Sequence, residues 1–113
     1  MEAVATWEQQ REDTALVLKI TGDVDLSNSD ELQRAIERLC VRARDEDVVL
    51  DLGDVRFIDS SGLRALYDGT RRASERVRLR YPAPHVLRLL EIALPGCFAI
   101  DGTEQGAEDV RTE

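Results

Sequence analysis

The hydrophobic residues of this chain follow two different spacings, and together the spacings predict strands that alternate with helices. Residues 15–20 and 48–52 are almost uninterrupted apolar runs that predict strands, the second of them covered on both faces. Residues 76–81 alternate strictly between charged and apolar side chains, which predicts a strand with one buried face. Shorter strands are expected near residues 4–10 and 97–100.

Turn-forming residues mark where these elements are expected to end. The polar segment 11–14 predicts a hairpin turn between the first two strands. The Thr-Gly-Asp sequence at 21–23 is expected to stop the second strand, and the Gly-Asp pair at 53–54 is expected to break the third. The Leu-Pro-Gly sequence at 94–96 is expected to end the last long helix.

Three helices are predicted where apolar residues recur every three or four positions. The first follows a segment rich in helix-capping residue types at 27–31, the second begins at 59–62, and the third begins at Pro84. The residues expected to face the core are, helix by helix, Leu32, Ala35, Ile36, Leu39 and Cys40; Leu63, Leu66 and Tyr67, with Ala65 and Ala73 as fillers; and Val86, Leu87 and Leu90.

This order of elements predicts an α/β fold with one mixed, mostly parallel sheet. About four or five strands would form the sheet, about three or four helices would pack on it, and each crossover between parallel strands would be right-handed. We expect a single domain over residues 1–113, with a core from about residue 4 to residue 108 and an acidic C-terminal tail.

The charge of the chain narrows the choice of partners. Its 113 residues include 23 Asp and Glu against 15 Lys and Arg, which gives a formal net charge of −8 at pH 7. Nucleic acid and anionic membranes would repel such a chain at long range, so neither is expected as a partner. The apolar runs are too short for a membrane span, and the N-terminus lacks the pattern of a secretory signal. A cytoplasmic protein without direct membrane insertion is therefore expected.

Few residues of the chain are suited to catalysis or metal binding. The only two cysteines and the only histidine, Cys40, Cys97 and His85, are too few for a four-ligand zinc site of these residue types, and both thiols are expected to be buried and free. The only lysine, Lys19, lies in a strand, which argues against a nucleotide-binding or hydrolytic protein with a phosphate-binding loop. We therefore expect no metal, no cofactor and no enzymatic activity.

A cluster of arginines stands out in this acidic chain: Arg71, Arg72, Arg76, Arg78 and Arg80. The simplest interpretation is that they complement the end of the second helix and line the solvent face of the strand that follows. The alternative is contact with an acidic patch of a partner protein. Nucleic acid is disfavoured again, because no aromatic residues are interleaved with the arginines.

One segment, residues 54–63, carries candidate chemistry, because two serine hydroxyls stand where the second helix begins. The start of a helix exposes backbone N–H groups without partners and a partial positive charge, and both favour a phosphate. Gly62 would let another backbone approach closely. The plainer alternative is that Asp59 or Ser60 only caps the helix.

This segment and its surroundings resemble the signature of the STAS domain family, in particular of its bacterial anti-sigma factor antagonists. The likeness lies in Asp54-Val55-x-Phe57-Ile58-Asp59-Ser60-Ser61-Gly62-Leu63, preceded by the strand at 48–52. Upstream, residues 18–25 resemble the first motif of the family, a strand that ends in Gly-acidic-x-Asp, and residues 84–90 resemble its third helix. Three motifs in this order cover almost the whole chain.

The resemblance implies a switch controlled by phosphorylation. Proteins of this type bind an anti-sigma factor that is also a serine protein kinase and thereby free a sigma factor. Phosphorylation of the first serine of the motif releases them, and a phosphoserine phosphatase reverses the change. By position, Ser60 would be the phosphorylated residue. The residues implied in partner binding are Asp23, Asp25, Asp59, Ser61, Gly62 and Leu63.

One alternative remains within the same family. The chain would then be a STAS scaffold subunit of a signalling assembly or of a transport complex, and it would use the same surface for docking without obligatory phosphorylation. Ser60 and Ser61 together favour the switch, although relatives outside sigma regulation can retain a serine there.

Overall fold

The strands of the chain assemble into one sheet with two kinds of pairing. The computed structural model describes residues 4–102, and over these residues the strand order is β1-β2-β3-β4-β5. β1 (Ala5–Glu12) pairs antiparallel with β2 (Ala15–Val24), whereas β2, β3 (Asp47–Ile58), β4 (Val77–Arg80) and β5 (Ala99–Asp101) are parallel to one another. The predicted α/β fold with one mixed, mostly parallel sheet is confirmed. The predicted tail after residue 102 lies outside the described residues.

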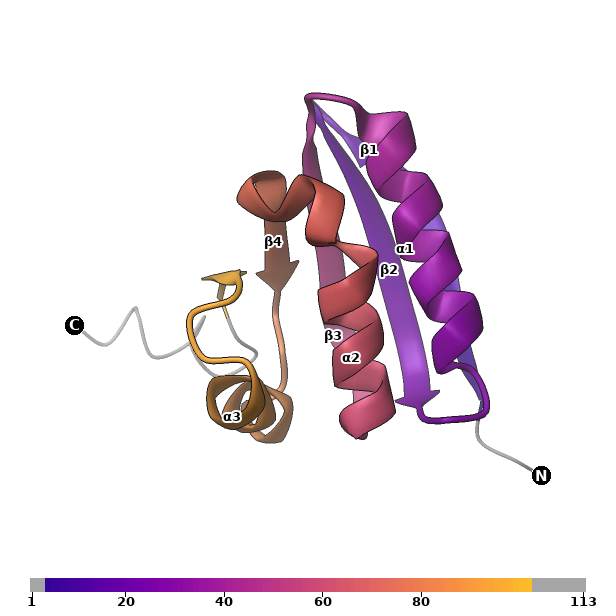
Figure 1. Cartoon of the computed structure of the whole chain (residues 1–113), viewed down its shortest axis with the longest axis vertical. Coiled ribbons are helices and arrows are strands. Elements are labelled where there is room, and N and C mark those ends of the chain that lie inside the picture. Colours follow the sequence, from indigo (N-terminus) through magenta and orange to yellow (C-terminus); the bar gives the residue numbers. More distant parts are fainter. Residues whose placement is uncertain (1–3, 103–113) are drawn as a thin grey trace.

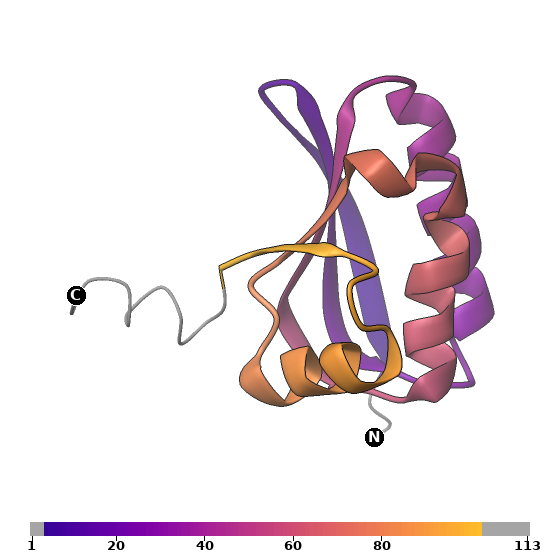
Figure 2. The same cartoon turned by 60° about the vertical axis from the view of Figure 1, so that its left-hand side comes forward.

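Three α-helices and one 3-10 helix connect the strands. α1 (Ser29–Ala43) joins β2 to β3, α2 (Ser60–Gly69) and the 3-10 helix η1 (Arg71–Arg76) join β3 to β4, and α3 (Pro84–Ala93) joins β4 to β5. α1 and α2 lie side by side on one face of the sheet and begin at the same end of it, near which α3 also lies (Figures 1 and 2). Among the described residues, no helix has the length and apolar character needed to cross a membrane.

The apolar stripes predicted from the sequence form the core between the helices and the sheet. All five residues of the predicted α1 stripe are buried, as are Leu63 and Leu66 of α2 and Val86 and Leu90 of α3. The helices pack on alternate residues of the central strands, because successive side chains of a strand point to opposite faces. This packing holds the start of α2 in a fixed position at the edge of the sheet.

Two residues that were predicted to be buried are exposed. Tyr67 is 42% exposed, because the buried face of α2 runs through Leu66 and Gly69, and each step along a helix turns the side chain by about 100°. Cys97 is also exposed, since it lies in the loop between α3 and β5 and not in the strand predicted for it. Cys40 is buried as predicted.

Two glycines that were predicted to end strands lie within them. β2 continues through Gly22 to Val24, and β3 continues through Gly53 to Ile58. At Gly22 the φ angle is +102°, and a Cβ atom would come within 2.2 Å of the carbonyl oxygen of Val4, so glycine permits a close backbone approach. The pairing of β2 with β3 shifts its register beside both glycines, which identifies β-bulges where strand ends were predicted.

The sheet face opposite α1 and α2 is closed by charged side chains. Val17 and Val49 alternate with core residues and so point to this face, yet they are 0% and 5% exposed. Arg80 on β4 reaches across β3 and β2 to Glu12 on β1, with two guanidinium nitrogens 3.2 and 2.9 Å from the carboxylate oxygens. Glu12 can meet Arg80 because it belongs to β1, and the hairpin turn is shorter than predicted and contains only residues 13–14.

Candidate functional site

The start of α2 lies where the parallel strands β2 and β3 end. Val24 ends β2 and Ile58 ends β3, and the two residues are paired in the sheet. The loops that follow parallel strands meet at the same edge of a sheet (Figure 1). The backbone N–H of Asp59 donates to the carbonyl oxygen of Val24 at 3.2 Å, and this bond ties the first residue after β3 to the end of β2.

The sequence offered Asp59 and Ser60 as possible caps of α2, and Asp59 is the residue that caps it. Its Oδ1 atom accepts the backbone N–H of Gly62 at 3.0 Å and the hydroxyl of Ser61 at 2.6 Å. Partial burial by itself raises the pKa of Asp59, but the hydrogen bonds from Ser61 and Gly62 outweigh burial and keep that pKa below its usual value. Asp59 is therefore an anion at neutral pH that holds the entry to α2 in one conformation.

Ser60 and Ser61 differ in what they offer to another molecule. Ser61 is partly buried and donates its hydroxyl to Asp59. Ser60 is exposed as the first residue of α2, and within residues 4–102 its hydroxyl makes no hydrogen bond. A modifying enzyme can therefore reach the hydroxyl of Ser60 more readily than that of Ser61.

Gly62 and Leu63 support the site from the core of the domain. Both are buried, and Leu63 packs in the core between α2 and the sheet. A Cβ atom on Gly62 would lie 2.5 Å from Cγ1 of Ile58 and 2.8 Å from Cγ1 of Val24. Glycine at this position lets α2 pack against the strand ends, so Gly62 and Leu63 shape the site and do not face solvent.

Asp23 and Asp25 lie at the end of β2, next to the start of α2, and both are partly buried. Asp23 Oδ1 is 3.4 Å from a guanidinium nitrogen of Arg56. Asp25 Oδ1 accepts the N–H of Ser27 at 3.0 Å and its hydroxyl at 2.6 Å. The Asn28 side chain accepts the N–H of Asp25 and donates to the carbonyl oxygen of Asp23, each at 3.0 Å. These bonds fix the loop before α1, at the end of the sheet where α2 begins.

Two exposed apolar side chains that the sequence analysis missed flank the same loops. Leu26, between β2 and α1, is 78% exposed, and Phe57, near the end of β3, is 49% exposed. Large apolar side chains on an otherwise polar surface favour contact with another protein. Leu26 had a signal in the sequence, because it stands alone between Asp25 and Ser27 in a turn. No pattern in the sequence indicated that Phe57 is exposed, because its exposure follows from the second bulge between β2 and β3.

The sequence of the chain also matches a family model over most of its length. The family described as "Mlab, STAS domain" matches residues 7–94, which include α1, α2, α3 and both loops of the site. This chain belongs to the STAS domain family. The resemblance seen in the sequence motifs is thereby confirmed for the family.

Solved structures share the fold of this STAS domain over nearly their whole length. An anti-sigma factor antagonist from Mycobacterium paratuberculosis has a TM-score of 0.77 at 20% identity, with 97% of this chain and 96% of that chain covered. The anti-sigma factor antagonist SpoIIAA in its unphosphorylated form has a TM-score of 0.70 at 21% identity, with 96% and 98% covered. The Bacillus cell fate determinant SpoIIAA in its phosphorylated form has a TM-score of 0.65 at 19% identity, with 96% and 100% covered.

The STAS domain thus brings the predicted site residues together at one edge of its sheet. We call the patch formed by Asp23, Asp25, Leu26, Phe57, Asp59, Ser60 and Ser61 the α2-entry surface. Over residues 4–102, no three His, Cys, Asp or Glu side chains are grouped to hold a metal ion. Among these residues, the hydroxyl of Ser60 is exposed, whereas that of Ser61 is held by Asp59.

Proposed function

We propose that this STAS domain is an anti-sigma factor antagonist controlled by phosphorylation of Ser60. In the unphosphorylated form it binds an anti-sigma factor that is also a serine kinase, and a sigma factor is released. Phosphorylation of Ser60 ends this binding, and a phosphoserine phosphatase restores it. The chain acts in the cytoplasm as a ligand and a substrate, without catalytic activity of its own.

The observation that carries this proposal is the contrast between the two serines at the start of α2. Ser60 is exposed with a hydroxyl that makes no hydrogen bond to residues 4–102, whereas the hydroxyl of Ser61 is held by Asp59 at 2.6 Å. A kinase needs an accessible hydroxyl on a backbone that it can approach. Only the first serine of the pair meets both conditions.

The fold is compatible with phosphorylation. SpoIIAA, which shares the fold, is described in an unphosphorylated and in a phosphorylated form. Backbone N–H groups at the start of α2 and the partial positive charge of the helix end would offset part of the phosphate charge within the domain. We therefore expect phosphorylation to change the surface of the domain without unfolding it.

The change in surface charge is large enough to act as a switch. A phosphate on Ser60 adds about −1.5 to −2 charges at neutral pH, next in sequence to the ionised Asp59. Leu26 and Phe57 supply the apolar part of the contact, and a dianion beside them would have to lose water when the partner docks. A difference of about 3 kcal/mol in binding would change the affinity about 10²-fold.

The experiment that tests the proposal maps the modified residue. The protein is incubated with ATP and the candidate anti-sigma serine kinases of its host, and the products are analysed by mass spectrometry. We expect one phosphate, on Ser60. The matched variants are S60A, which should accept none, and S61A, which should still be phosphorylated. A phosphate on Ser61 in the wild-type protein, with Ser60 unmodified, would contradict the assignment.

A STAS scaffold subunit without a switch would give a different result. Its partner would bind S60A, S60E and the wild-type protein with equal affinity, because residue 60 would then serve only as part of a static contact. The switch predicts that S60A binds like the wild-type protein and that S60E binds poorly while its circular dichroism spectrum remains native.

A further inference from the structure

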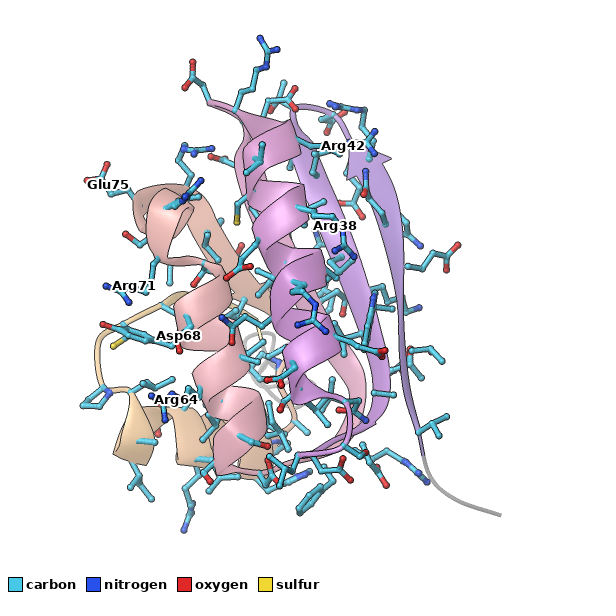
Figure 3. All side chains as sticks on the ribbon, turned by 45° about the vertical axis from the view of Figure 1, so that its right-hand side comes forward. Arg38, Arg42, Arg64, Asp68, Arg71 and Glu75 are labelled. Carbon is cyan, nitrogen blue, oxygen red and sulfur yellow. The ribbon has the colours of Figure 1, made fainter. Side chains whose placement is uncertain are left out.

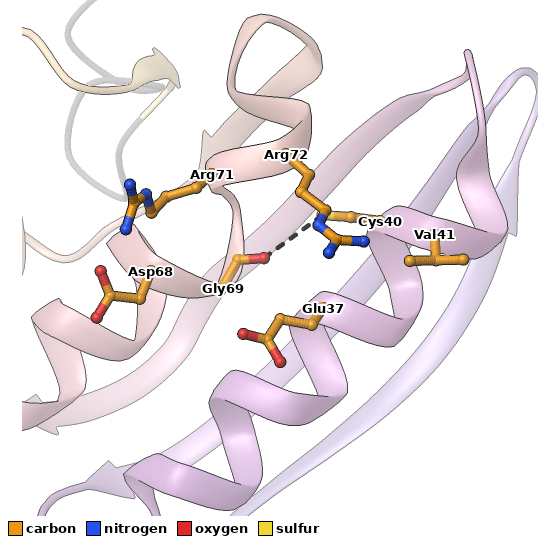
Figure 4. A pocket seen from close by; sticks show the side chains of 7 residues that line it. All are labelled: Glu37, Cys40, Val41, Asp68, Gly69, Arg71 and Arg72. Carbon is orange, nitrogen blue, oxygen red and sulfur yellow. Dashed lines mark hydrogen bonds between the residues drawn. The ribbon is translucent and has the colours of Figure 1, made fainter.

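A second surface lies on the outer side of the helices. Arg34, Arg38 and Arg42 follow one another at four-residue spacing along α1, so at the rise of a helix they form a ridge about 12 Å long. Figure 3 shows Arg38 and Arg42 on this helix. Arg71 and Arg72 of η1 line the far wall of the groove that separates α1 from the end of α2 (Figure 4). All five arginines are exposed.

These five arginines are not engaged in ion pairs within the described part of the domain. Over residues 4–102, none of them has a carboxylate oxygen within 4.0 Å. Five other arginines each have such a partner: Arg11, Arg56, Arg64, Arg78 and Arg80. The charges on the outer face of α1 and η1 are therefore available to another molecule.

The five arginines of the cluster seen in the sequence fall into two groups, those with a partner inside the domain and those without one. Arg76 donates to the carbonyl oxygen of Glu46 at 2.6 Å, and Arg78 and Arg80 pair with carboxylates of the sheet, so these three have roles inside the domain. Arg71 and Arg72 follow the end of α2, where the simplest interpretation of the cluster places them. Within residues 4–102 neither pairs with a carboxylate, so both can also contact a partner.

The groove between α1 and α2 has a volume of about 570 Å³. At its floor the two helices pack closely, because Gly69 has no side chain and a Cβ atom there would lie 3.0 Å from Cβ of Ile36. The thiol of Cys40 donates to the carbonyl oxygen of Gly69 at 3.8 Å (Figure 4). Val41, which is 60% exposed, adds an apolar side chain to the rim.

Two carboxylates line the same groove, and both are already engaged. Asp68 lies 3.5 Å from the guanidinium of Arg64, one turn earlier on α2. Glu37 accepts a hydrogen bond from the side-chain amide of Gln33 at 3.1 Å. Five free arginines against two engaged carboxylates make this face basic, in a chain whose formal net charge is −8.

We propose that this face, formed by Arg34, Arg38, Arg42, Arg71 and Arg72 around Val41, binds a carboxylate-rich segment of a partner protein that also carries an apolar side chain. Separate carboxylates can pair with the arginines and avoid Glu37 and Asp68, whereas a continuous phosphate backbone would meet both of them and the negative charge of the whole domain. Val41 and the aliphatic stems of the arginines provide the apolar contact.

The site is independent of the function proposed for Ser60. Ser60 begins α2, whereas Gly69 ends it and the arginines lie beside that end and along α1. Both surfaces can therefore be occupied at once, and a variant of one can be tested without disturbing the other.

The test uses a fluorescein-labelled synthetic helical peptide with glutamates at four-residue spacing and leucines beside them. Titration into the wild-type protein should saturate, weaken with added salt, and shift the amide resonances of residues 34–42 and 68–72. R38Q/R42Q and R71Q/R72Q should each weaken binding about tenfold. R38K/R42K should retain most of it. The matched control is R88Q, on α3, which removes an exposed arginine elsewhere and should leave the affinity unchanged, as should S60E.

Three results would overturn the inference. The first is the absence of saturable peptide binding. The second is an equal affinity of the wild-type protein and R38Q/R42Q, when circular dichroism shows that both are folded. The third is tighter binding of a single-stranded oligonucleotide or of phosphatidylglycerol vesicles to the same arginines, which would assign the face to nucleic acid or to a membrane.

Discussion

Asp59 determines how its neighbours behave at the start of α2. By accepting the hydroxyl of Ser61 and the N–H of Gly62, it orders the first turn of the helix and leaves the hydroxyl of Ser60 free. Its low pKa keeps it ionised, so a phosphate on Ser60 would stand next to an existing negative charge. A single carboxylate thus couples the stability of the helix start to the chemistry expected of Ser60.

Removal of this cap should destabilise the domain. D59A leaves the N–H of Gly62 and the hydroxyl of Ser61 without their acceptor, and we expect a loss of about 1 kcal/mol in the free energy of unfolding. Urea denaturation measures the effect. S60A is the matched control, because its hydroxyl makes no bond within residues 4–102, and it should change stability by less than about 0.5 kcal/mol. Equal stability of D59A and S60A would contradict the role of the cap.

A methyl group at position 62 should also be costly. In G62A the added Cβ would press on Ile58 and Val24, both buried, and the domain should lose about 1 to 3 kcal/mol of stability. Comparing the melting temperatures of G62A and S61A distinguishes the effect of packing from the effect of losing a hydroxyl group. An unchanged melting temperature of G62A would show that α2 does not need this close approach.

At the scale of elements, the sequence predicted the helices better than the strand ends. The α1 stripe was predictable because five apolar residues at helical spacing leave only one face to bury. The continuation of β2 through Gly22 and of β3 through Gly53 was not, because a glycine in a bulge and a glycine in a turn look alike until the neighbouring strand is known. The exposure of Phe57 depends on the same bulges, so this part of the candidate site was hidden as well.

The bulge at Gly22 offers a test of this interpretation. G22A would combine a φ of +102° with a contact of 2.2 Å to the Val4 carbonyl oxygen, and we expect it to loosen β1 and to accelerate hydrogen exchange of its amides. The matched control is G96A, where φ is +73° but no atom lies within 4 Å of the added Cβ. G22A should be less stable than G96A by about 1 to 3 kcal/mol. Equal stability would show that the strand contact is unimportant.

At the scale of the whole molecule, ion pairs join strands on the sheet face that α1 and α2 do not cover. The hydrogen bond from Arg80 keeps the pKa of Glu12 below its usual value, and the hydrogen bond from Arg78 does the same for the pKa of Asp101. These pairs link β4 to strands on both of its sides. They could not be predicted from the sequence, because Glu12 and Arg80 are 68 residues apart and meet only through the strand order.

The lowered pKa values predict how stability depends on pH. Carboxyl groups whose pKa is lower in the folded state stabilise the fold above their unfolded-state pKa, and this contribution is lost as the pH falls through the folded-state pKa. Stability should therefore decrease as the pH falls below about 4. Chemical denaturation at several pH values should show a smaller decrease for R80Q than for the wild-type protein. R88Q should follow the wild-type curve, and an R80Q curve parallel to the wild type would contradict the pairing.

The proposed switch can be tested by one binding measurement. Protein that carries an authentic phosphate on Ser60 and unmodified protein are titrated, by calorimetry, into the anti-sigma serine kinase that phosphorylates it. The phosphorylated form is expected to bind about 10²-fold more weakly, with an unchanged circular dichroism spectrum. Equal affinity of the two folded forms would show that the charge on Ser60 does not control the contact.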